Sequence, residues 1–590
     1  MIFVERRRAG FTADLFWRVG LVWLVVAAIF VAVRWSAIAG MQLPDADDSL
    51  RLVQLRDLIA GQGWFDLHQY RVAPPEGMLM HWSRLVDVPL VIVFAALAPL
   101  LGNALAEQVT LVLVPLIALF LAMLLAGRLA WRMLGDGAIV YTCLILALLT
   151  AVTAQLQPLR IDHHGWQIVM LLAALNGLTA RSERTGGRIA GFFMALGMTI
   201  SLELLPLAAL IGAVLALRWL LDPKAKALSL HYIRTLAGTS VIAFLATRGL
   251  ADLAPHCDTL SPAYLGALLS IAICLSFLGL APAMPRPALA LGMAASGSLG
   301  IGTLLLLAPA CTAGPFVMLD PLVQQYWYAN VREGMPVWRQ DLDVALRLVI
   351  PPLAGLIAAF RLWQASQGWL RRFWFEYALI AAGTLALGLV VSRSAGFAAA
   401  MAAVPLGWML RDWHRKAQAM RPGGRRIALL AGAVLLIMPD LPLKAARLLA
   451  SRPAVSPPVA QRACDIAAAA PALRRLGPGA TIFAPIDSGP MLLLHSPHKV
   501  VATAHHRAPQ ALHDVIAAFL ASPADAEAIV SKRGASHVAL CPALAEVAIY
   551  REAAPRGLAA SLAEGKTPAW LRPVPMPQDS GLLVWEVTRR

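Results

Sequence analysis

Long apolar runs separated by short polar loops fill the first three quarters of the chain. A helix needs about 20 apolar residues to cross a membrane, and thirteen runs approach or exceed that length. We therefore predict an α-helical polytopic membrane protein with thirteen spans. They lie near residues 16–40, 107–131, 137–157, 165–181, 188–202, 203–221, 233–253, 262–282, 288–310, 343–361, 374–391, 396–410 and 427–441.

One further apolar run, residues 86–102, is assigned differently. It is short and follows Pro74-Pro75. Counting it as a span would move the basic residues Arg128 and Arg132 to the outer side of the membrane. We therefore predict that it forms an interfacial helix lying near the membrane surface.

The pattern changes from about residue 442 onward, where Gly, Pro and charged residues return. Short apolar runs bounded by turn signals alternate there with Ala-rich helical stretches, which indicates a small α/β domain with a parallel sheet. The predicted strands are 481–484, 499–502 and 537–540, and the predicted helical stretches are 510–533 and 543–564. We predict a transmembrane domain over 1–441, with outer loops at 41–106, 155–164 and 311–342, and an α/β domain over 442–590.

Composition and charge place the chain in a membrane. It is 59% hydrophobic and 14% charged, whereas a soluble protein carries about 25% charged residues. The net charge of +16 comes largely from basic loops such as Arg6 to Arg8, Arg371-Arg372 and 411–426. This is the pattern of cytoplasmic loops, which makes nucleic-acid binding the weaker interpretation, and we predict no nucleic-acid partner. We predict a bacterial inner-membrane protein with a cytoplasmic N-terminus and a periplasmic C-terminal domain.

Two outer segments carry groups that bind metals. In Leu43-Pro44-Asp45-Ala46-Asp47-Asp48, three neighbouring carboxylates repel one another, and a divalent cation would relieve that repulsion. The alternative is an acidic cap on the helix that begins near Ser49. In Arg160-Ile161-Asp162-His163-His164-Gly165, a carboxylate and imidazoles one or two residues apart can reach a common metal such as Mn²⁺.

Two more outer segments complete a candidate site. The loop 311–342 carries Glu333, and Arg393 lies between Ser392 and Ser394 at the outer end of a span, where it can bind phosphate. Separate spans thus bring four candidate metal ligands to the outer face: Asp47, Asp162, His164 and Glu333. A divalent metal (Mn²⁺ or Mg²⁺) held there, with Arg393 beside it, suits Lewis-acid chemistry on a lipid-phosphate substrate.

These segments resemble, in order, the motifs of the STT3-like oligosaccharyltransferase catalytic subunits, which belong to the GT-C membrane glycosyltransferases. The run from Asp47-Asp48-Ser49 to Gly61 resembles the first acidic motif, which implies that Asp47 rather than Asp45 is a metal ligand. Asp162-His163-His164 resembles the second acidic motif and implies Asp162 and His164 as ligands. Val331 to Pro336 resembles the motif of the fifth external loop, whose Glu helps to hold the metal and activate the acceptor.

A fourth resemblance lies in the C-terminal domain. Asp487-Ser488-Gly489 resembles the region of the Trp-Trp-Asp motif, which implies acceptor binding by Asp487. The chain departs from the family here, because Ala484-Pro485-Ile486 stands where the two tryptophans belong. In the family that motif recognises the hydroxyl residue of the Asn-X-Ser/Thr acceptor, so the departure implies a different acceptor.

The resemblance implies a catalytic transmembrane domain that transfers a sugar or oligosaccharide from a polyprenyl-(pyro)phosphate donor on the periplasmic face. Arg393 would contact the donor phosphate. The acceptor is a protein, a lipid or a polysaccharide. Two alternatives are a secondary transporter, which would need ionisable groups near the middle of the bilayer, and a non-catalytic membrane scaffold, which leaves the acidic and His motifs unexplained.

The cysteines give one further prediction. Cys464 and Cys541 both fall in the predicted periplasmic domain, where disulfides persist, so we predict a bridge between them; the alternative is two separate buried thiols. The other four cysteines, Cys143, Cys257, Cys274 and Cys311, lie in or near spans and show no obvious partner.

Overall fold

The computed structural model describes residues 10–450 and 464–588, so the basic residues Arg6 to Arg8 lie outside the described part. The chain forms two compact units. The first takes in Met1–Gln42, Trp82–Pro315 and Arg332–Ala450, and the second takes in Leu43–His81, Phe316–Val331 and Ser451–Arg590. Each unit is described on its own below.

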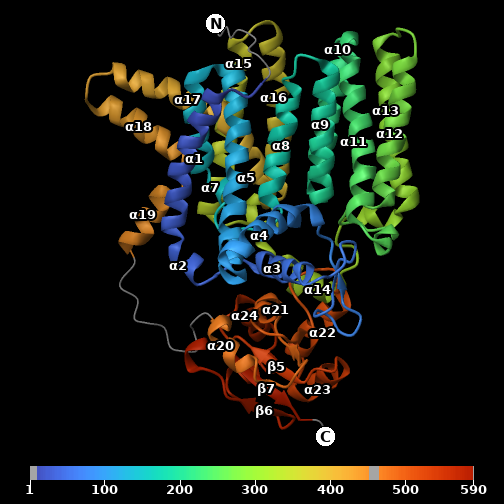
Figure 1. Ribbon diagram of the computed structural model, residues 1–590, viewed down its shortest axis with the longest axis vertical. Coiled ribbons are helices and arrows are strands. Elements are labelled where there is room, and N and C mark those ends of the chain that lie inside the picture. Colours follow the sequence, from blue (N-terminus) through green and yellow to red (C-terminus); the bar gives the residue numbers. More distant parts are fainter. Residues whose placement is uncertain (1–9, 451–463, 589–590) are drawn as a thin grey trace. The chain divides into compact units, whose positions relative to one another are not determined.

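The first unit is a bundle of helices, most of which run upright in Figure 1. Each of the thirteen predicted apolar runs forms a helix or a broken helix. The bounds are α1 Ala13–Val33, α2 Trp35–Ala39, α4 Asp87–Leu101, α5 Asn103–Leu134, α6 Ile139–Leu148, α7 Thr150–Thr153, α8 His164–Leu178, α9 Glu183–Ile200, α10 Leu205–Leu221, α11 Lys226–Thr247, α12 Pro262–Leu280, α13 Arg286–Leu307, α15 Leu342–Ala365, α16 Gly368–Val390, α17 Ala395–Ala419, α18 Gly424–Ile437 and α19 Leu441–Ala450.

The length and composition of these helices make this a multi-pass membrane protein. Among the described residues, nine helices are long and apolar enough to cross a membrane, or up to ten if α18 and α19, which meet at a bend of 88°, count as one span. Several of the remaining helices are shorter, such as α8 with 15 residues. The number of thirteen crossings therefore stays a prediction.

The segment predicted to lie at the membrane surface forms the short helix η1 (Arg84–Val86) followed by α4. Together they are long and apolar enough to qualify as a span. Figure 1 nevertheless draws α4 across the ends of the upright helices. Its direction agrees with the interfacial placement, which remains a prediction.

Small residues allow α9 and α11 to pack closely. A Cβ added at Gly187 would lie 2.4 Å from the carbonyl oxygen of Leu228, and one added at Gly191 would lie 2.4 Å from that of Tyr232. The two glycines are four residues apart and therefore share one face of α9. Close backbone approach through such a pair is a common way for helices to associate in lipid, where apolar burial gives little driving force.

The expectation that Cys257 and Cys311 lack a partner is wrong. They form a disulfide, with Cα atoms 5.1 Å apart. Cys257 follows α11 and Cys311 follows α13, so the bond joins the two polar segments that flank the α12–α13 helix pair. The pairing was not predicted because the two cysteines are 54 positions apart in the sequence, and the sequence alone does not show that they come together. Cys143 and Cys274 are free.

The second unit is an α/β structure around a five-stranded sheet. The strand order is β4-β3-β5-β7-β6. A separate two-stranded hairpin pairs β1 with β2. The bounds are α3 Ala46–Ile59, β1 His68–Gln69, β2 Met78–Leu79, α14 Pro321–Tyr326, α20 Ile466–Leu473, β3 Thr481–Phe483, α21 Gly489–His495, β4 Lys499–Val500, α22 Pro509–Leu520, α23 Pro523–Lys532, β5 His537–Leu540, α24 Ala545–Ala553, α25 Leu558–Ala563, β6 Leu571–Val574 and β7 Leu583–Val587.

The predicted strands at β3, β4 and β5 are present, and β3 pairs in parallel with both neighbours. The expectation of a wholly parallel sheet is wrong, because β7 runs antiparallel to both β5 and β6. The short connection 575–582 returns the chain beside β6, and so short a link permits antiparallel pairing where a parallel pair would need a longer crossover. β5 is buried along its whole length, as strands covered on both faces are.

The polar segment after the first span folds together with the C-terminal part of the chain. Val72 forms a parallel bridge with Val500 at the edge strand β4, and Arg71 donates hydrogen bonds of 3.0 Å to the carbonyl oxygens of Leu493 and Ser496. The bridge and the half-buried Arg71, which binds carbonyl groups at the end of α21, satisfy backbone groups that would otherwise be costly to bury. Residues 43–81 are thereby anchored to the α/β sheet.

Cys464 and Cys541 form a disulfide, with Cα atoms 5.9 Å apart. The bond ties the segment before α20 to the end of β5.

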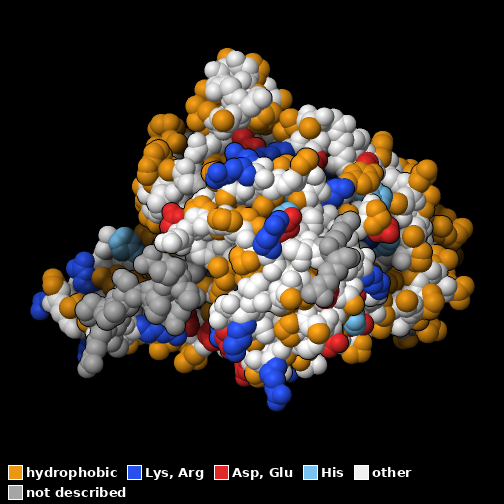
Figure 2. Space-filling view, turned by 90° about the horizontal axis from the view of Figure 1, so that it is seen from below, with side chains coloured by type: hydrophobic (Ala, Val, Ile, Leu, Met, Phe, Trp, Pro, Cys, Tyr) orange, Lys and Arg blue, Asp and Glu red, His pale blue; other side chains and the backbone are white. Residues whose placement is uncertain are grey.

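The surface of this unit carries charged pairs such as Lys566–Glu564 and Arg572–Glu586. Figure 2, the view from below, shows acidic and basic side chains interspersed with apolar ones.

The packing of α9 on α11 can be tested with one methyl group. Gly191→Ala should destabilise the protein by about 1–3 kcal/mol, because the new Cβ overpacks the contact with the Tyr232 carbonyl. The measurement is thermal unfolding of the full chain in detergent. Gly238→Ala on α11 is the matched control, since a Cβ there meets nothing within 4 Å. Equal midpoints for the two variants would contradict the close packing.

Candidate functional site

The segment between α7 and α8 places the Asp-His-His triplet at one end of the first unit. Leu159, in the left-handed conformation at φ 71°, donates its N–H to the Leu111 carbonyl at 2.9 Å. Gly165 follows the triplet, and a Cβ there would lie 2.6 Å from the Gln155 carbonyl oxygen. A glycine is therefore required for α8 to begin against this loop, which turns Asp162 and the two histidines inward.

Asp162 joins both histidines. Its two carboxylate oxygens lie 2.5 Å from Nδ1 of His163 and 2.5 Å from Nδ1 of His164. The imidazole rings stack with centroids 4.2 Å apart, and all three side chains are buried. Burial alone would raise the pKa of the Asp162 carboxyl, but the imidazoles beside it hold that pKa well below its usual range. Asp162 is therefore an ionised carboxylate.

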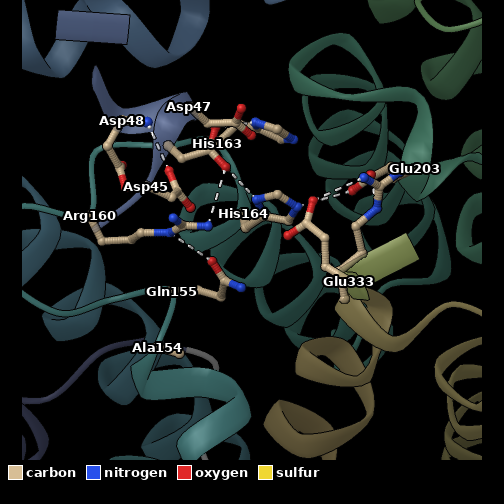
Figure 3. Close-up of polar contacts among 12 residues, drawn as sticks. Asp45, Asp47, Asp48, Ala154, Gln155, Arg160, His163, His164, Glu203 and Glu333 are labelled. Atoms are coloured by element: carbon tan, nitrogen blue, oxygen red, sulfur yellow. Dashed lines mark hydrogen bonds and ion pairs between the residues drawn. The ribbon is translucent and has the colours of Figure 1, made fainter. Parts of the chain in front are cut away.

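Arg160 approaches the same carboxylate. Its guanidinium lies 3.8 Å from Asp162 and donates to the side-chain oxygen of Gln155 at 3.2 Å. Figure 3 shows Arg160, Gln155 and the His163–His164 pair around this point. A buried cation beside a buried anion lowers the cost of keeping both away from water.

Glu203 extends the cluster and was not among the residues predicted for the site. It lies in the short helix η3 (Leu202–Leu204) just before α10. Its carboxylate is 3.5 Å from Nε2 of His164 and 2.6 Å from Nε of Arg393. The sequence does contain one indication of its role: Glu203 is a lone acidic residue at the junction of two apolar runs. Burying such a residue without a partner is costly.

Arg393 also reaches Glu333. It lies in the short helix η10 (Ser392–Ser394), before α17, and its terminal nitrogen is 3.4 Å from the Glu333 carboxylate. The backbone N–H and the hydroxyl of Ser392 both donate to the Met335 carbonyl, at 3.1 Å and 2.6 Å. These two bonds anchor the loop that carries Glu333 beside Arg393.

Of the predicted site residues, the structure therefore brings four together within the first unit: Asp162, His164, Glu333 and Arg393. Opposite charges alternate along this group, because Glu203 lies between His164 and Arg393 and pairs with both. Asp162, Glu203 and Arg393 lie just before α8, α10 and α17, His164 is the first residue of α8, and Glu333 lies in the short helix η8 (Arg332–Gly334).

The group has the donors that a divalent metal ion requires. Asp162, His163 and His164 offer one ligand atom each within 4.8 Å of one another. The Nε2 of His164 is buried, and its distance of 3.5 Å from Glu203 lies outside the normal range of a hydrogen bond. A buried imidazole nitrogen that, among the described residues, is held only by this long contact to Glu203, next to an ionised carboxylate, suits a metal such as Mn²⁺.

Asp47 belongs to the second unit. Asp45 is the N-cap of α3, with its side chain accepting from the N–H of Asp48 at 3.0 Å. Asp47, in the first turn, instead lies 3.1 Å from Nε2 of His505, whose Nδ1 is 3.0 Å from the Thr503 hydroxyl. Capping thus accounts for Asp45 but leaves the Asp47 carboxylate directed at an imidazole. Its role as a ligand stays a prediction.

Asp487 lies in the short helix η12 (Ile486–Ser488) of the second unit and is exposed. The turn is held from behind by Glu546 on α24, whose two oxygens accept the backbone N–H groups of Ile486 and Asp487, each at 2.8 Å. Tyr550 donates its hydroxyl to the same carboxylate at 2.6 Å. Burial, together with the neighbouring Asp487 carboxylate, raises the pKa of Glu546 to about 8.

Comparison with known proteins identifies the fold. No protein-family model matches the chain, and no curated protein matches its sequence. Solved structures do match. The oligosaccharyltransferase AglB of Archaeoglobus fulgidus, in complex with an inhibitory peptide and a dolichol-phosphate, matches with a TM-score of 0.67 and 15% identity, over 94% of this chain and 72% of that one.

Two further structures of the Archaeoglobus fulgidus oligosaccharyltransferase agree. The apo form gives a TM-score of 0.64 at 16% identity over 95% of this chain and 73% of that one. The complex with Zn and sulfate gives 0.60 at 15% identity over 93% and 71%. The chain therefore has the fold of these oligosaccharyltransferases, which confirms the fold expected from the sequence motifs.

The support of the Asp487 turn by Glu546 gives a testable expectation. Glu546→Gln should loosen the turn, because the two backbone N–H groups bind different oxygens and the amide replaces one of these oxygens by an NH₂ group, which cannot accept. Leaving one of them unpaired costs about 1–3 kcal/mol. Hydrogen exchange of the peptide around 484–490, measured in the full chain, should become faster.

The matched control is Glu552→Gln, an exposed position on the same helix. It should leave the exchange of this peptide unchanged. If Glu546→Gln has no greater effect than the control, Glu546 does not hold the turn.

Proposed function

We propose that this protein is an integral-membrane glycosyltransferase that transfers a sugar or an oligosaccharide from a polyprenyl-(pyro)phosphate donor to an acceptor on the periplasmic face, with a divalent metal ion as cofactor. The observation that carries the proposal is the buried Asp162-His163-His164 cluster, linked through Glu203 and Arg393 to Glu333, in a chain with an oligosaccharyltransferase fold. The dolichol-phosphate in the complex of the Archaeoglobus fulgidus enzyme supports a polyprenyl phosphate as the donor group.

Asp162 and His164 would hold the metal, and Asp47 and Glu333 would complete its ligand set. The carboxylate and imidazole atoms of this set suit Mn²⁺ or Mg²⁺. A bound divalent ion supplies Lewis-acid stabilisation of the negative charge that develops on the leaving phosphate. Arg160, 3.8 Å from Asp162, would help to keep that carboxylate oriented.

Arg393 would bind the donor phosphate. Its guanidinium carries five N–H donors in a planar fork. Glu203 engages Nε at 2.6 Å, whereas Glu333 engages a terminal nitrogen at the longer distance of 3.4 Å. A phosphate oxygen can therefore take the place of Glu333 while Glu203 keeps the side chain oriented. Charge-assisted bonds of this kind are among the stronger hydrogen bonds in proteins.

Release of Glu333 from Arg393 frees a carboxylate for the acceptor. Its side chain is 42% exposed, so an acceptor hydroxyl or amino group can reach it. In the transfer, a bond forms between the acceptor atom and the anomeric carbon, and the bond from that carbon to the phosphate oxygen breaks. Glu333 takes the proton of the acceptor, and the polyprenyl (pyro)phosphate leaves with the bonding electrons.

The acceptor is proposed to differ from the Asn-X-Ser/Thr sequon. Ala484, Pro485 and Ile486, which stand in the place of the family's tryptophans, are buried, and they offer no aromatic surface to a Ser or Thr side chain. Asp487 is the exposed residue of the turn and would contact the acceptor. A protein side chain, a lipid headgroup and a polysaccharide each offer a hydroxyl or amino group for that contact.

The placement of the charged residues favours an enzyme over a secondary transporter. Asp162 precedes α8, Glu203 precedes α10, and Arg393 precedes α17. They therefore lie at the ends of helices. Transporters place their substrate and ion sites near the middle of the bilayer, where helices are broken.

Asp47→Ala and Asp162→Asn should each lower the rate of transfer by about a hundredfold or more, which corresponds to roughly 3 kcal/mol of transition-state stabilisation. The assay uses the full chain in lipid nanodiscs with labelled polyprenyl-linked sugars extracted from membranes, and it measures the release of polyprenyl phosphate. A chelator should abolish the release, and added Mn²⁺ should restore it.

Asp412→Asn is the control. Asp412 is a surface carboxylate of the unit that contains Asp162, and it pairs with Lys416. This variant should retain full activity. Equal levels of purified protein exclude a folding defect. Full turnover in Asp47→Ala, or in the presence of the chelator, would contradict metal-dependent transfer.

A further inference from the structure

A cavity of about 150 Å³ lies between α10 and α16, away from the site described above. Its polar walls include Arg218, thirteen residues after Leu205 at the start of α10. At 1.5 Å per residue this is about 20 Å along the helix axis, whereas Glu203 lies just before the start of the same helix. The cavity and the candidate site are therefore at opposite ends of the bundle, in different leaflets of a membrane whose apolar core is about 30 Å thick.

The polar side of the cavity contains two guanidinium groups and two carboxylates. Arg218 pairs with Glu376 at 3.3 Å and, outside the cavity, with Glu183 at 3.2 Å. Arg372 pairs with Asp222 at 3.0 Å. The Nε of Arg218 is buried and donates to no acceptor within the described part of the chain. A buried donor of this kind is costly unless an acceptor is bound there.

The other side of the cavity is apolar and follows one face of each helix. Residues three or four positions apart share a helix face, and this spacing holds on both helices. The apolar lining consists of Val214, Leu217, Leu221, Phe375 and Leu379. Leu221 is 54% exposed, and the side chain of Arg372 is 49% exposed, so the cavity opens at the surface of the unit.

We propose that this cavity binds an aminophospholipid of the leaflet opposite the candidate active site. The lipid phosphate would accept from Nε of Arg218 and from Arg372, and its primary ammonium would donate to Glu376 and Asp222. One acyl chain would lie along the apolar face. Pockets with basic residues between membrane helices are common headgroup sites, and this one has equal numbers of positive and negative wall residues, which match a zwitterion.

The same charges exclude the other abundant lipid classes. An anionic headgroup such as glycerol phosphate would leave the carboxylates without a cation. A choline headgroup carries a cation without N–H donors and so makes no hydrogen bonds to Glu376 or Asp222. The preferred lipid is therefore phosphatidylethanolamine.

The test is native mass spectrometry of the full chain, delipidated in detergent and then exposed to phosphatidylethanolamine, phosphatidylcholine or phosphatidylglycerol at equal concentration. Phosphatidylethanolamine should be retained about tenfold better than either of the others, as the loss of one hydrogen bond to a charged group predicts. Equal retention of the three lipids, or better retention of phosphatidylglycerol, would overturn the proposal.

Two variants sharpen the test. Arg372→Gln should lower the retention of phosphatidylethanolamine about tenfold, and its exposed position makes misfolding a minor concern. Arg371→Gln is the matched control, because Arg371 is the neighbouring residue on α16 and its guanidinium lies over the Trp363 ring at 5.4 Å, outside the cavity lining. Equal losses in the two variants would contradict the assigned site.

Asp222→Asn gives a readout that a structural defect would not produce. Removing one carboxylate leaves an excess positive charge in the cavity, so the preference should shift from phosphatidylethanolamine toward phosphatidylglycerol. If this variant still prefers phosphatidylethanolamine to phosphatidylglycerol by the same factor, the lipid ammonium does not bind Asp222 and Glu376.

Discussion

Charged side chains at the ends of membrane helices are stable only when they are paired, and this constraint organises the candidate site. Asp162, Glu203 and Arg393 begin three different helices, and each meets an opposite charge from another segment or an imidazole. The pairing fixes how α8, α10 and α17 approach one another at this end of the bundle. The paired side chains also form a cluster of both charges. Its contacts can be replaced by contacts to a metal ion and a phosphate with little change in net charge.

The second unit holds the two remaining candidate residues, Asp47 and Asp487. The segment after the first span is joined to the α/β sheet by the Val72–Val500 bridge and by Arg71, so Asp47 is held by a domain formed mainly by the end of the chain. His505 lies against Asp47, and Glu546 supports the turn of Asp487. One proposed metal ligand, Asp47, and the proposed acceptor contact, Asp487, thus come from the same folded unit. The chain passes from the second unit to the first between Val331 and Arg332, two residues before Glu333.

Much of this architecture could be predicted from the sequence, because apolar runs and turn signals are local. They located the helices, three of the five sheet strands and the Asp162-His163-His164 triplet. Glu203 was missed because its partners, His164 and Arg393, are distant in sequence and its own neighbours are apolar. The Cys257–Cys311 bond depends on the packing of α12 and α13. β6 was missed because Arg572 and Pro573 interrupt its strand pattern. β7 was not predicted either, although Leu583–Val587 is a short, mainly apolar run.

The central proposal is that Asp47 and Asp162 hold one metal ion. The most direct measurement is a cryo-electron microscopy structure of the full chain with Mn²⁺ and a polyprenyl-linked sugar. The account predicts a single ion with oxygen atoms of both carboxylates at about 2.0–2.6 Å, as metal–ligand distances require. An ion held by the Asp162 cluster while Asp47 lies on the opposite face of the membrane would contradict it.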